Sequence, residues 1–372
     1  MGRIIRAMSQ PSSSKVSELQ IHTRKAAPKL KSGVRYWRSD MTRQLQIGSR
    51  FSNFLLPNQL GSLELEPALA LLADGKLANI SDAQDLISVL ANLSLLDLEV
   101  TEIDYRYGDE ESRNIAASIK RSVAQESFLS RIKIEADGIT RAPKLKDGGV
   151  RKVLERREFA VQIHGSGRIA FALLGTLIAA GFDLSEISES KEVLGKDVIG
   201  GCVSKRDIGL SARLKANELL GESSLYPEPL KVLKRADLII SISRPFPEVL
   251  QDWNRERIPQ LFIDFDSAGE VRIGPYVEPG SSACYNCVKL AEYEGGIPSL
   301  SALNGSFPKN DSDVTAALAT FCAGVVTLAV AQIADTGKSD LYEKSALYST
   351  LSYLEPQITA WERSPRCGCN WI

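Results

Sequence analysis

Short apolar runs separated by turn residues fill the N-terminal part of the chain and then give way to helical periodicity. The runs at 34–39, 44–48 and 54–56 predict three short strands, and a proline directly follows the third. Residues 64–75 predict a helix that opens with an acidic, proline-containing turn and ends at Asp74–Gly75. These elements describe a small module of strands followed by helices.

A second helix is predicted directly after the capping signal Ser81–Asp82. Its apolar residues fall on one face at helical spacing: Leu86, Val89, Leu90, Leu93 and Leu96. Strands and helices in this order predict a winged-helix-like module over 33–104. The second helix carries Asp82 and Asp85 and no Arg or Lys that would face phosphates, so we expect the module to bind a peptide rather than nucleic acid.

A glycine loop follows a strongly apolar strand in the second half of the chain. The strand at 159–165 runs into Gly-x-Gly-x-x-Ala, formed around Gly165 and Gly167, and then into a helix over 168–181. Glycines at this spacing permit a tight turn and let a phosphate approach the backbone at the start of the helix. The alternative interpretation is that they only pack the helix against the sheet.

Further apolar strands at 238–243 and 260–265 alternate with helices, which predicts an α/β fold with a Rossmann-like sheet. The charged stretch between the two halves predicts a linker or insertion with a helix near 112–127. The expected plan is a basic flexible tail, the winged-helix-like module, the linker and the α/β domain, at 1–32, 33–104, 105–157 and 158–372.

The segment Val314–Ala334 is apolar and long enough to span a membrane. It contains three threonines and a glutamine and has no basic flank, and the rest of the chain has the pattern of a soluble protein. A helix that is apolar on all sides is otherwise buried. We therefore expect a helix in the core or in a dimer interface, and no membrane.

The charge is balanced overall but not along the chain. The net charge is −1, and 44% of the residues are hydrophobic, which is typical of a soluble globular protein. The first fifty residues carry eleven Arg and Lys against Glu18 and Asp40. This excess indicates either a solvated tail or attraction for an acidic ligand. Only His22 and His164 are present, so we do not expect histidine-driven hydrolysis.

Four of the six cysteines form two tight pairs, Cys284 with Cys287 and Cys367 with Cys369. Two such pairs can complete a tetrahedral zinc site, and four thiolates leave no open position, so the zinc would be structural. Disulfides and simple buried thiols are the alternatives. No secretory signal is seen at the start, and we expect a cytoplasmic protein in which disulfides are rare.

These motifs together resemble the ThiF-type superfamily, whose members include relatives of ubiquitin-activating (E1) enzymes. The resemblance extends from about Val34 onward. It is carried by the glycine loop, by Asp207–Gly209, by the run Ile273–Gly280 leading into Cys284, and by the closing Ser364–Cys369. More closely, the chain resembles ThiF-like leader-peptide-binding proteins of azole-forming ribosomal peptide (RiPP) pathways, which are the partners of YcaO cyclodehydratases. The resemblance implies antibiotic-type biosynthesis, a ThiF-type Rossmann-like domain with a zinc-tethered C-terminus, and a homodimer.

In that family the leader peptide adds as a strand beside the third strand of the winged-helix module and lies against a helix. The resemblance places this groove at Arg50–Leu56 and Asp82–Leu96. The candidate peptide-binding residues are Arg50, Phe51, Asn53, Phe54, Leu55, Leu56, Asp82, Leu86, Val89 and Leu90.

The nucleotide pocket departs from the pattern of adenylating relatives. Glu189–Lys191 stands where an Asp-x-Asp is expected, Lys215 is out of register with the expected lysine, and Ser241–Pro245 replaces a later acidic stretch. Adenylation needs carboxylates that bind Mg²⁺. ATP is therefore doubtful, and the nucleotide residues implied by the resemblance are Gly165, Gly167, Arg168 and Glu189.

Cys202 is the single candidate thioester nucleophile, because Cys322 lies in the apolar helix. With no clear catalytic residue, the sequence favours a non-catalytic role: the protein would bind the leader of a precursor peptide and present its core to a YcaO-type cyclodehydratase. The alternative is a ThiF-type enzyme that uses ATP to adenylate a peptide carboxylate. A Rossmann oxidoreductase is disfavoured, because a cysteine-tethered tail has no role there.

Overall fold

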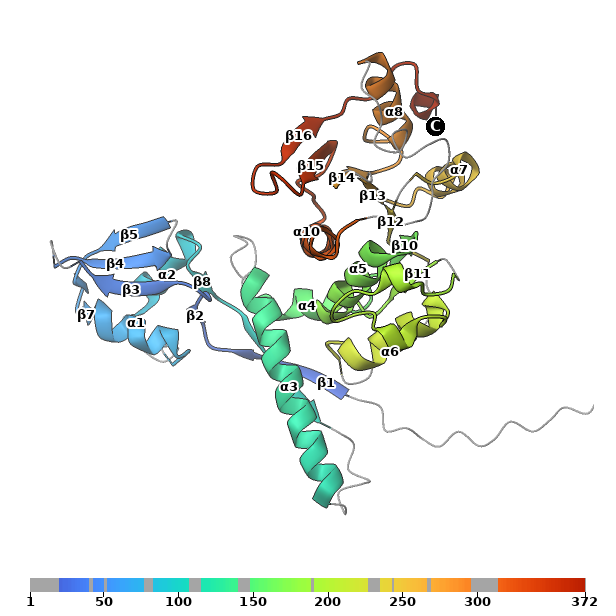
Figure 1. The fold of residues 1–372 in the computed structure, drawn as a ribbon. Coiled ribbons are helices and arrows are strands. Elements are labelled where there is room, and N and C mark those ends of the chain that lie inside the picture. Colours follow the sequence, from blue (N-terminus) through green and yellow to red (C-terminus); the bar gives the residue numbers. More distant parts are fainter. Residues whose placement is uncertain are drawn as a thin grey trace, which may run out of the picture. The chain divides into compact units, whose positions relative to one another are not determined.

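The structure is a computed structural model, and the chain divides into two compact units. The N-terminal unit comprises residues 1–133 and 137–148, and the C-terminal unit comprises 134–136 and 149–372. Figure 1 labels the elements. The structure describes residues 20–39, 43–49, 52–76, 83–106, 115–139, 148–188, 191–226, 235–242, 244–265, 269–295 and 314–371.

The centre of the N-terminal unit is a three-stranded antiparallel sheet with two helices, as the sequence predicted. The strands are β3 (Arg35–Arg38), β4 (Leu45–Ser49) and β5 (Ser52–Leu56), in the order β3-β4-β5. The helices are α1 (Leu65–Ala73) and α2 (Gln84–Asn92). Their apolar faces close one core, whose most deeply buried members include Leu45, Ile47, Leu69, Leu72 and Leu90.

Three further strand pairs are described in this unit. β1 (Gln20–Ala26) pairs antiparallel with β9 (Val100–Arg106) along its full length. The remaining pairs are β2 (Lys29–Leu30) with β8 (Leu96–Asp97) and β6 (Gln59–Leu60) with β7 (Leu63–Glu64). Residues 20–26 and 29–30 thus form paired strands, although they were expected to belong to a tail. Their partners lie 66–86 residues further along the chain, and local composition carries no sign of them.

The predicted linker contains two helices, α3 (Ile115–Ile139) and α4 (Val150–Arg156). Arg156, at the end of α4, is almost fully buried. Its guanidinium binds both carboxylate oxygens of Asp335, at 2.9 and 2.6 Å, and donates to Glu135 at 3.0 Å and to the Ala180 carbonyl at 3.1 Å. This ion cluster fixes α4 to the C-terminal unit.

The C-terminal unit is built on a seven-stranded sheet in the order β11-β10-β12-β13-β14-β15-β16. The first four strands are parallel and the last three antiparallel. Their bounds are β10 Val161–His164, β11 Ser185–Ile187, β12 Leu238–Ile242, β13 Gln260–Phe265, β14 Glu270–Val277, β15 Lys344–Ser349 and β16 Gln357–Ala360. The predicted α/β class is confirmed.

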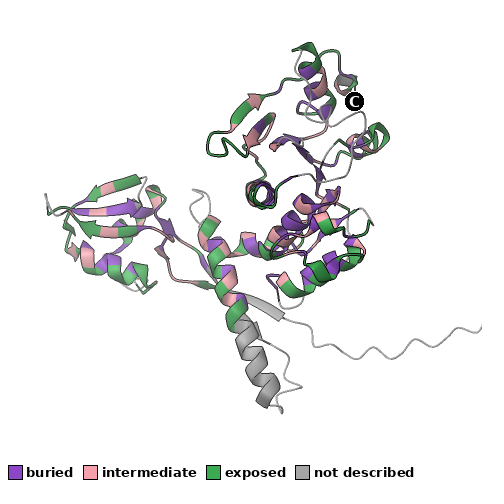
Figure 2. Cartoon of the chain, in the orientation of Figure 1, coloured by how far each residue is buried: buried purple, intermediate pink, exposed green. Residues whose placement is uncertain are grey.

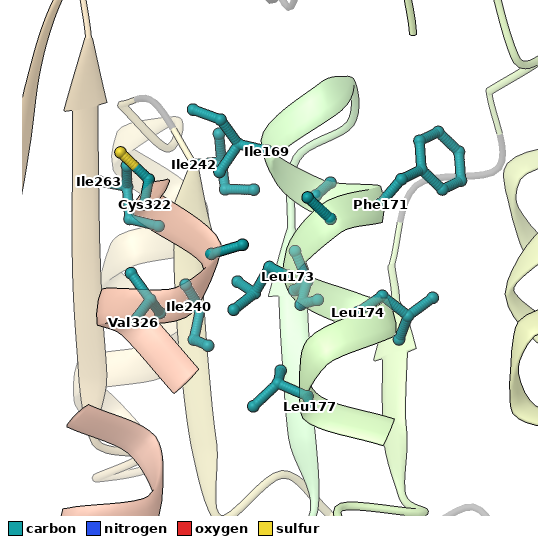
Figure 3. Close-up of a cluster of buried hydrophobic side chains, with 14 of the residues drawn as sticks. Ile169, Phe171, Leu173, Leu174, Leu177, Ile240, Ile242, Ile263, Cys322 and Val326 are labelled. Carbon is teal, nitrogen blue, oxygen red and sulfur yellow. The ribbon is translucent and has the colours of Figure 1, made fainter. Parts of the chain in front are cut away.

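Helices cover both faces of this sheet (Figure 1). α5 (Arg168–Ala179), α6 (Ala212–Ser223) and α10 (Ala316–Thr336) share one core with the sheet, and α7 (Pro247–Arg255) and α8 (Tyr285–Glu294) share another. Strand residues alternate between the two cores: Leu238 and Ile240 belong to the first, and Ile239 to the second. Figure 3 shows the first core, where α5, α10 and the strands meet.

Among the described helices, α10 is the one that is long and apolar enough to cross a membrane, a test that the core helix of a soluble protein also passes. Its inner residues, among them Cys322, Val326 and Val330, are fully buried against α5 and the sheet (Figure 3). Its packing is that of a core helix. Phe321 and Leu328 on its outer side are exposed.

Candidate functional site

The chain reverses its direction across the sheet at β10. It passes from β10 through α5 to β11 on one side, and the next strand, β12, lies on the other side of β10. In open α/β sheets, ligands bind at such a switch point, outside the carboxyl ends of the strands. The region beyond the ends of β10 and β12, where open α/β sheets form a crevice, is therefore the candidate site, and the glycine loop lies in it.

Two glycines give this loop its shape. Gly165 has a φ of 129°, and a Cβ at this position would lie 2.8 Å from the Cβ of Ile242 at the end of β12. Gly167 has a φ of 98° and a ψ of −171°, a conformation that is essentially restricted to glycine, and it caps α5. Gly165 thus serves packing, whereas Gly167 presents the first amides of α5 to the crevice.

A second helix begins beside the same loop. Arg168, the first residue of α5, donates from Nη1 to the carbonyl of Val314 at 3.2 Å, just before α10 begins. Further along, the hydroxyls of Thr176 on α5 and Thr327 on α10 are 2.7 Å apart. The two helices therefore run in the same direction, and both direct the positive end of the helix dipole toward this edge. The sequence analysis did not foresee this pairing.

The one remaining predicted nucleotide residue lies outside the described part of the chain, and the out-of-register lysine is engaged. Glu189 lies outside the described residues. Lys215 forms an ion pair with Asp207 at 3.2 Å. The Ser204 backbone N–H, together with Lys215, holds the pKa of Asp207 below its usual range. Burial opposes the charge of Lys215, yet Asp207 raises its pKa, so this lysine is committed to the turn that precedes α6.

Cys202, Cys322 and His164 do not have the surroundings of a nucleophilic site. Burial raises the pKa of Cys202, and it raises that of Cys322 to about 12, so both are protonated thiols at neutral pH. His164 packs edge-on against Trp253 with ring centroids 5.1 Å apart, and Ser188 Oγ lies 3.4 Å from its Nδ1.

The four paired cysteines meet at the start of α8. Their sulfur atoms all lie within 4.8 Å of one another. Cys284 is 3.8 Å from Cys287 and 3.5 Å from Cys367, and Cys287 is 3.5 Å from Cys369. A tetrahedral zinc about 2.3 Å from each sulfur requires sulfurs about 3.8 Å apart, whereas a disulfide requires about 2 Å. The geometry fits a metal ion.

The cysteine cluster fastens the end of the chain to α8. The backbone N–H of Ser364 donates to the sulfur of Cys287 at 3.4 Å. Burial opposes the charge of Cys287, but this bond and the neighbouring thiols lower its pKa, which favours the thiolate that a metal requires. Cys367 and Trp361 belong to the same core as α8.

Charged residues form a buried cluster between α8 and the sheet. Arg272 on β14 donates to both Asp264 on β13 and Glu292 on α8. Lys289 lies 3.0 Å from Glu292 and 3.7 Å from Asp264, and the Tyr285 hydroxyl donates to Asp264 at 3.1 Å. Burial alone would raise the pKa of Asp264, but Arg272 and Lys289 hold it below the ordinary value. The sequence holds a sign of this cluster that was missed: a charged residue stands inside an otherwise apolar strand, Asp264 in β13 and Arg272 in β14.

The predicted peptide residues occupy different environments in the N-terminal unit. Leu86 and Leu90 are buried in its core. Asn53, Leu55 and Val89 are exposed, and the side chain of Leu55 is 62% accessible. Phe54 is partly buried and Leu56 is buried, while Arg50, Phe51 and Asp82 lie outside the described residues.

Comparisons with known proteins identify the fold. No family model and no curated protein matches the chain. Among solved structures, E. coli MccB with ATP matches at a TM-score of 0.58 and 15% identity, over 93% of this chain and 99% of that chain. E. coli MccB with MccA-N7isoASN matches at 0.57 and 14%, over 92% and 99%. The microcin C7 biosynthetic enzyme MccB in complex with N-formylated MccA matches at 0.56 and 15%, also over 92% and 99%.

At these identities the likeness shows the fold. The fold supports the ThiF-like, E1-like resemblance found in the sequence, and it lends no support to a partnership with a YcaO cyclodehydratase. It also overturns the prediction of a non-catalytic leader-binding protein, because MccB, whose structures match this chain, is a biosynthetic enzyme solved with ATP and with MccA. That prediction rested on the lack of acidic residues at the positions where adenylating relatives have them. Spacing along the sequence cannot show whether loops elsewhere in the chain supply such residues to the site.

Proposed function

We propose that the protein is an ATP-dependent enzyme that adenylates the carboxylate of a peptide. The main support is the likeness in fold to MccB, which extends along nearly the whole of both chains, in structures that hold ATP or the peptide MccA. The glycine loop at the switch point of the sheet supports it. In this reaction a carboxylate oxygen attacks the α-phosphorus of ATP, the bond to pyrophosphate breaks, and an acyl adenylate forms.

The chain contributes binding and charge neutralisation to this reaction. The amides after Gly167, at the start of α5, are oriented to receive phosphate oxygens. The adjoining start of α10 adds a second helix dipole of the same sign. Phosphoryl transfer depends mainly on such positioning and electrostatic stabilisation, so the absence of a nucleophilic thiol at this edge among the described residues is consistent with the proposal.

Replacing Gly167 tests the nucleotide site. We expect the wild-type protein to bind ATP and to catalyse ATP–pyrophosphate exchange with members of a library of peptides that have free carboxyl termini. In Gly167→Val the exchange rate should fall about 100-fold, because a side chain strains this backbone conformation and displaces the amides. Gly221→Ala, in an open position on α6, is the matched control and should keep wild-type activity. Wild-type protein that neither binds ATP nor exchanges pyrophosphate would refute the function.

We also propose that the N-terminal unit holds the peptide by strand addition at β5. Among the described strands, β5 pairs with β4 alone, so its other edge is open. Leu55 on β5 and Val89 on α2 supply exposed apolar surface.

Changes at these exposed residues should weaken peptide binding and leave folding intact. Leu55→Asp and Val89→Asp should each raise the KM for an exchange-competent peptide about 10-fold while leaving ATP affinity unchanged, since burial of one apolar side chain is worth about 1.5–3 kcal/mol. Leu71→Asp, at an exposed position on α1, is the control. Unchanged KM values for both variants, measured by exchange kinetics, would place the peptide elsewhere.

The cysteine cluster is proposed to hold one structural zinc, as four thiolates with no open position favour. Held there, the metal would tie residues 367–369 to the first turn of α8 and stabilise the face of the sheet that α8 covers. It would take no direct part in the chemistry.

A homodimer through α10 is proposed from the exposed side of that helix. Leu328 is 73% exposed, and Phe321 packs edge-on against Tyr348 of β15 with ring centroids 5.0 Å apart. The edge strand β16 carries a further exposed apolar side chain, Ile358, and is exposed except at Thr359 (Figure 2).

A charge on α10 should dissociate such a dimer. Sedimentation at micromolar concentration should give a dimer for the wild-type protein and a monomer for Leu328→Asp, because an unpaired carboxylate would be buried in the interface. Leu214→Asp, at an exposed site on α6, should remain dimeric. A monomeric wild-type protein would show that this surface serves another purpose.

A further inference from the structure

Arg244 is an exposed arginine at the edge of the candidate site. Arg244 follows β12 by two residues, and the last residue of β12, Ile242, is in close contact with Gly165 of the glycine loop. Figure 3 shows Ile242 close to Ile169 in the first turn of α5. Arg244 therefore lies beside the point where the strand end, the glycine loop and the start of α5 converge.

The guanidinium of Arg244 makes no hydrogen bond or ion pair with any residue that the structure describes. Its charge therefore stands close to the glycine loop without a described partner.

The buried charged cluster of β13, β14 and α8 does not neutralise Arg244. In that cluster the two cations, Arg272 and Lys289, face the two anions, Asp264 and Glu292, at contact distance. The cluster is balanced internally, so Arg244 adds a surplus positive charge at the edge of the sheet. A surplus cation beside amides that point outward attracts an anion.

Adenylation brings two anions together, the substrate carboxylate and the triphosphate, and their repulsion must be offset at the point of contact. A guanidinium is suited to this task because its planar donors bind oxyanions in a bidentate manner. We propose that Arg244 binds an oxyanion of the reacting pair, either a phosphate of ATP or the peptide carboxylate. This inference rests on the proposed function and assigns one of its substrate contacts.

Binding and exchange, measured on separate variants, test the assignment. ATP and inorganic pyrophosphate binding to the full chain are measured by calorimetry, and exchange kinetics use a peptide from the library. Arg244→Met removes the charge and keeps the length of the side chain. Arg244→Lys keeps the charge but loses the planar donors of the guanidinium. Arg255→Met is the control. Arg255 lies at the far end of α7 and is paired with Asp252 at 2.8 Å.

A phosphate contact predicts that Arg244→Met weakens ATP and pyrophosphate binding at least 10-fold, with Arg244→Lys in between. A carboxylate contact predicts unchanged ATP binding and a peptide KM at least 10-fold higher. Binding and KM within twofold of wild type in Arg244→Met would overturn the inference while leaving wild-type exchange, and so the function, in place. Arginine-dependent ATP binding without any exchange would overturn the function and keep the oxyanion site. A wild-type chain that binds neither anion overturns both.

Discussion

Cys287→Ser is expected to release the bound metal and to destabilise the C-terminal unit by several kcal/mol, since the binding energy of a structural zinc is also folding energy. Cys287 is central to the cluster: its sulfur is 3.8 Å from Cys284 and 3.5 Å from Cys369, and it accepts the Ser364 N–H. Without it, residues 364–369 lose two of their contacts with α8, from the Ser364 N–H and from Cys369.

Elemental analysis and thermal unfolding measure this result together. Wild-type protein should contain about one zinc per chain, and Cys287→Ser much less, with a clearly lower Tm. Cys202→Ser is the control, because Cys202 packs against α5 far from the cluster in the fold and should leave the zinc content unchanged. A metal-free wild-type protein whose Tm matches that of Cys287→Ser would show that the four thiols are packed without a metal.

Local sequence patterns predicted the elements that local interactions determine. The strand at 260–265 is β13 in full, because a predominantly apolar run between turn signals suits a strand buried on both faces. The helix after Gly167 was expected for the same kind of reason, since the glycines and the apolar periodicity lie within one stretch. The paired cysteines also meet as expected, across about eighty residues, because the one or two residues between the cysteines of each pair fix each half-site locally.

Features created by long-range packing were not foreseen. The pairing of β1 with β9 and the parallel start of α5 and α10 each join segments that are far apart in the chain. The mistaken functional prediction has the same origin. It treated carboxylates missing from expected positions as missing from the site, although a crevice at a switch point is lined by several loops whose residues the spacing of one motif does not locate.

Arg272→Met is expected to destabilise the protein by about 3–5 kcal/mol, because it leaves a buried carboxylate without its main partner. Asp264 and Glu292 are both nearly fully buried, and Lys289 alone would then face the two of them. Denaturant unfolding measures the loss. The double variant Arg272→Met with Asp264→Asn should recover much of it, since the Lys289–Glu292 pair at 3.0 Å remains balanced.

The pH dependence of the folding stability distinguishes an unpaired buried charge from the simple loss of a contact. In the wild-type protein the pKa of Asp264 is lowered, so its contribution is complete above about pH 4 and is lost only as the pH falls through the lowered value. In Arg272→Met one of the two carboxyls should take up a proton, with a pKa above its ordinary value. The folded state then binds more protons than the unfolded state, so the stability of the variant should decrease as the pH rises from 5 to 8, while that of the double variant stays flat. A variant that loses less than about 1 kcal/mol and shows no such slope would mean that water reaches this cluster and that α8 is held to the sheet by its apolar contacts instead.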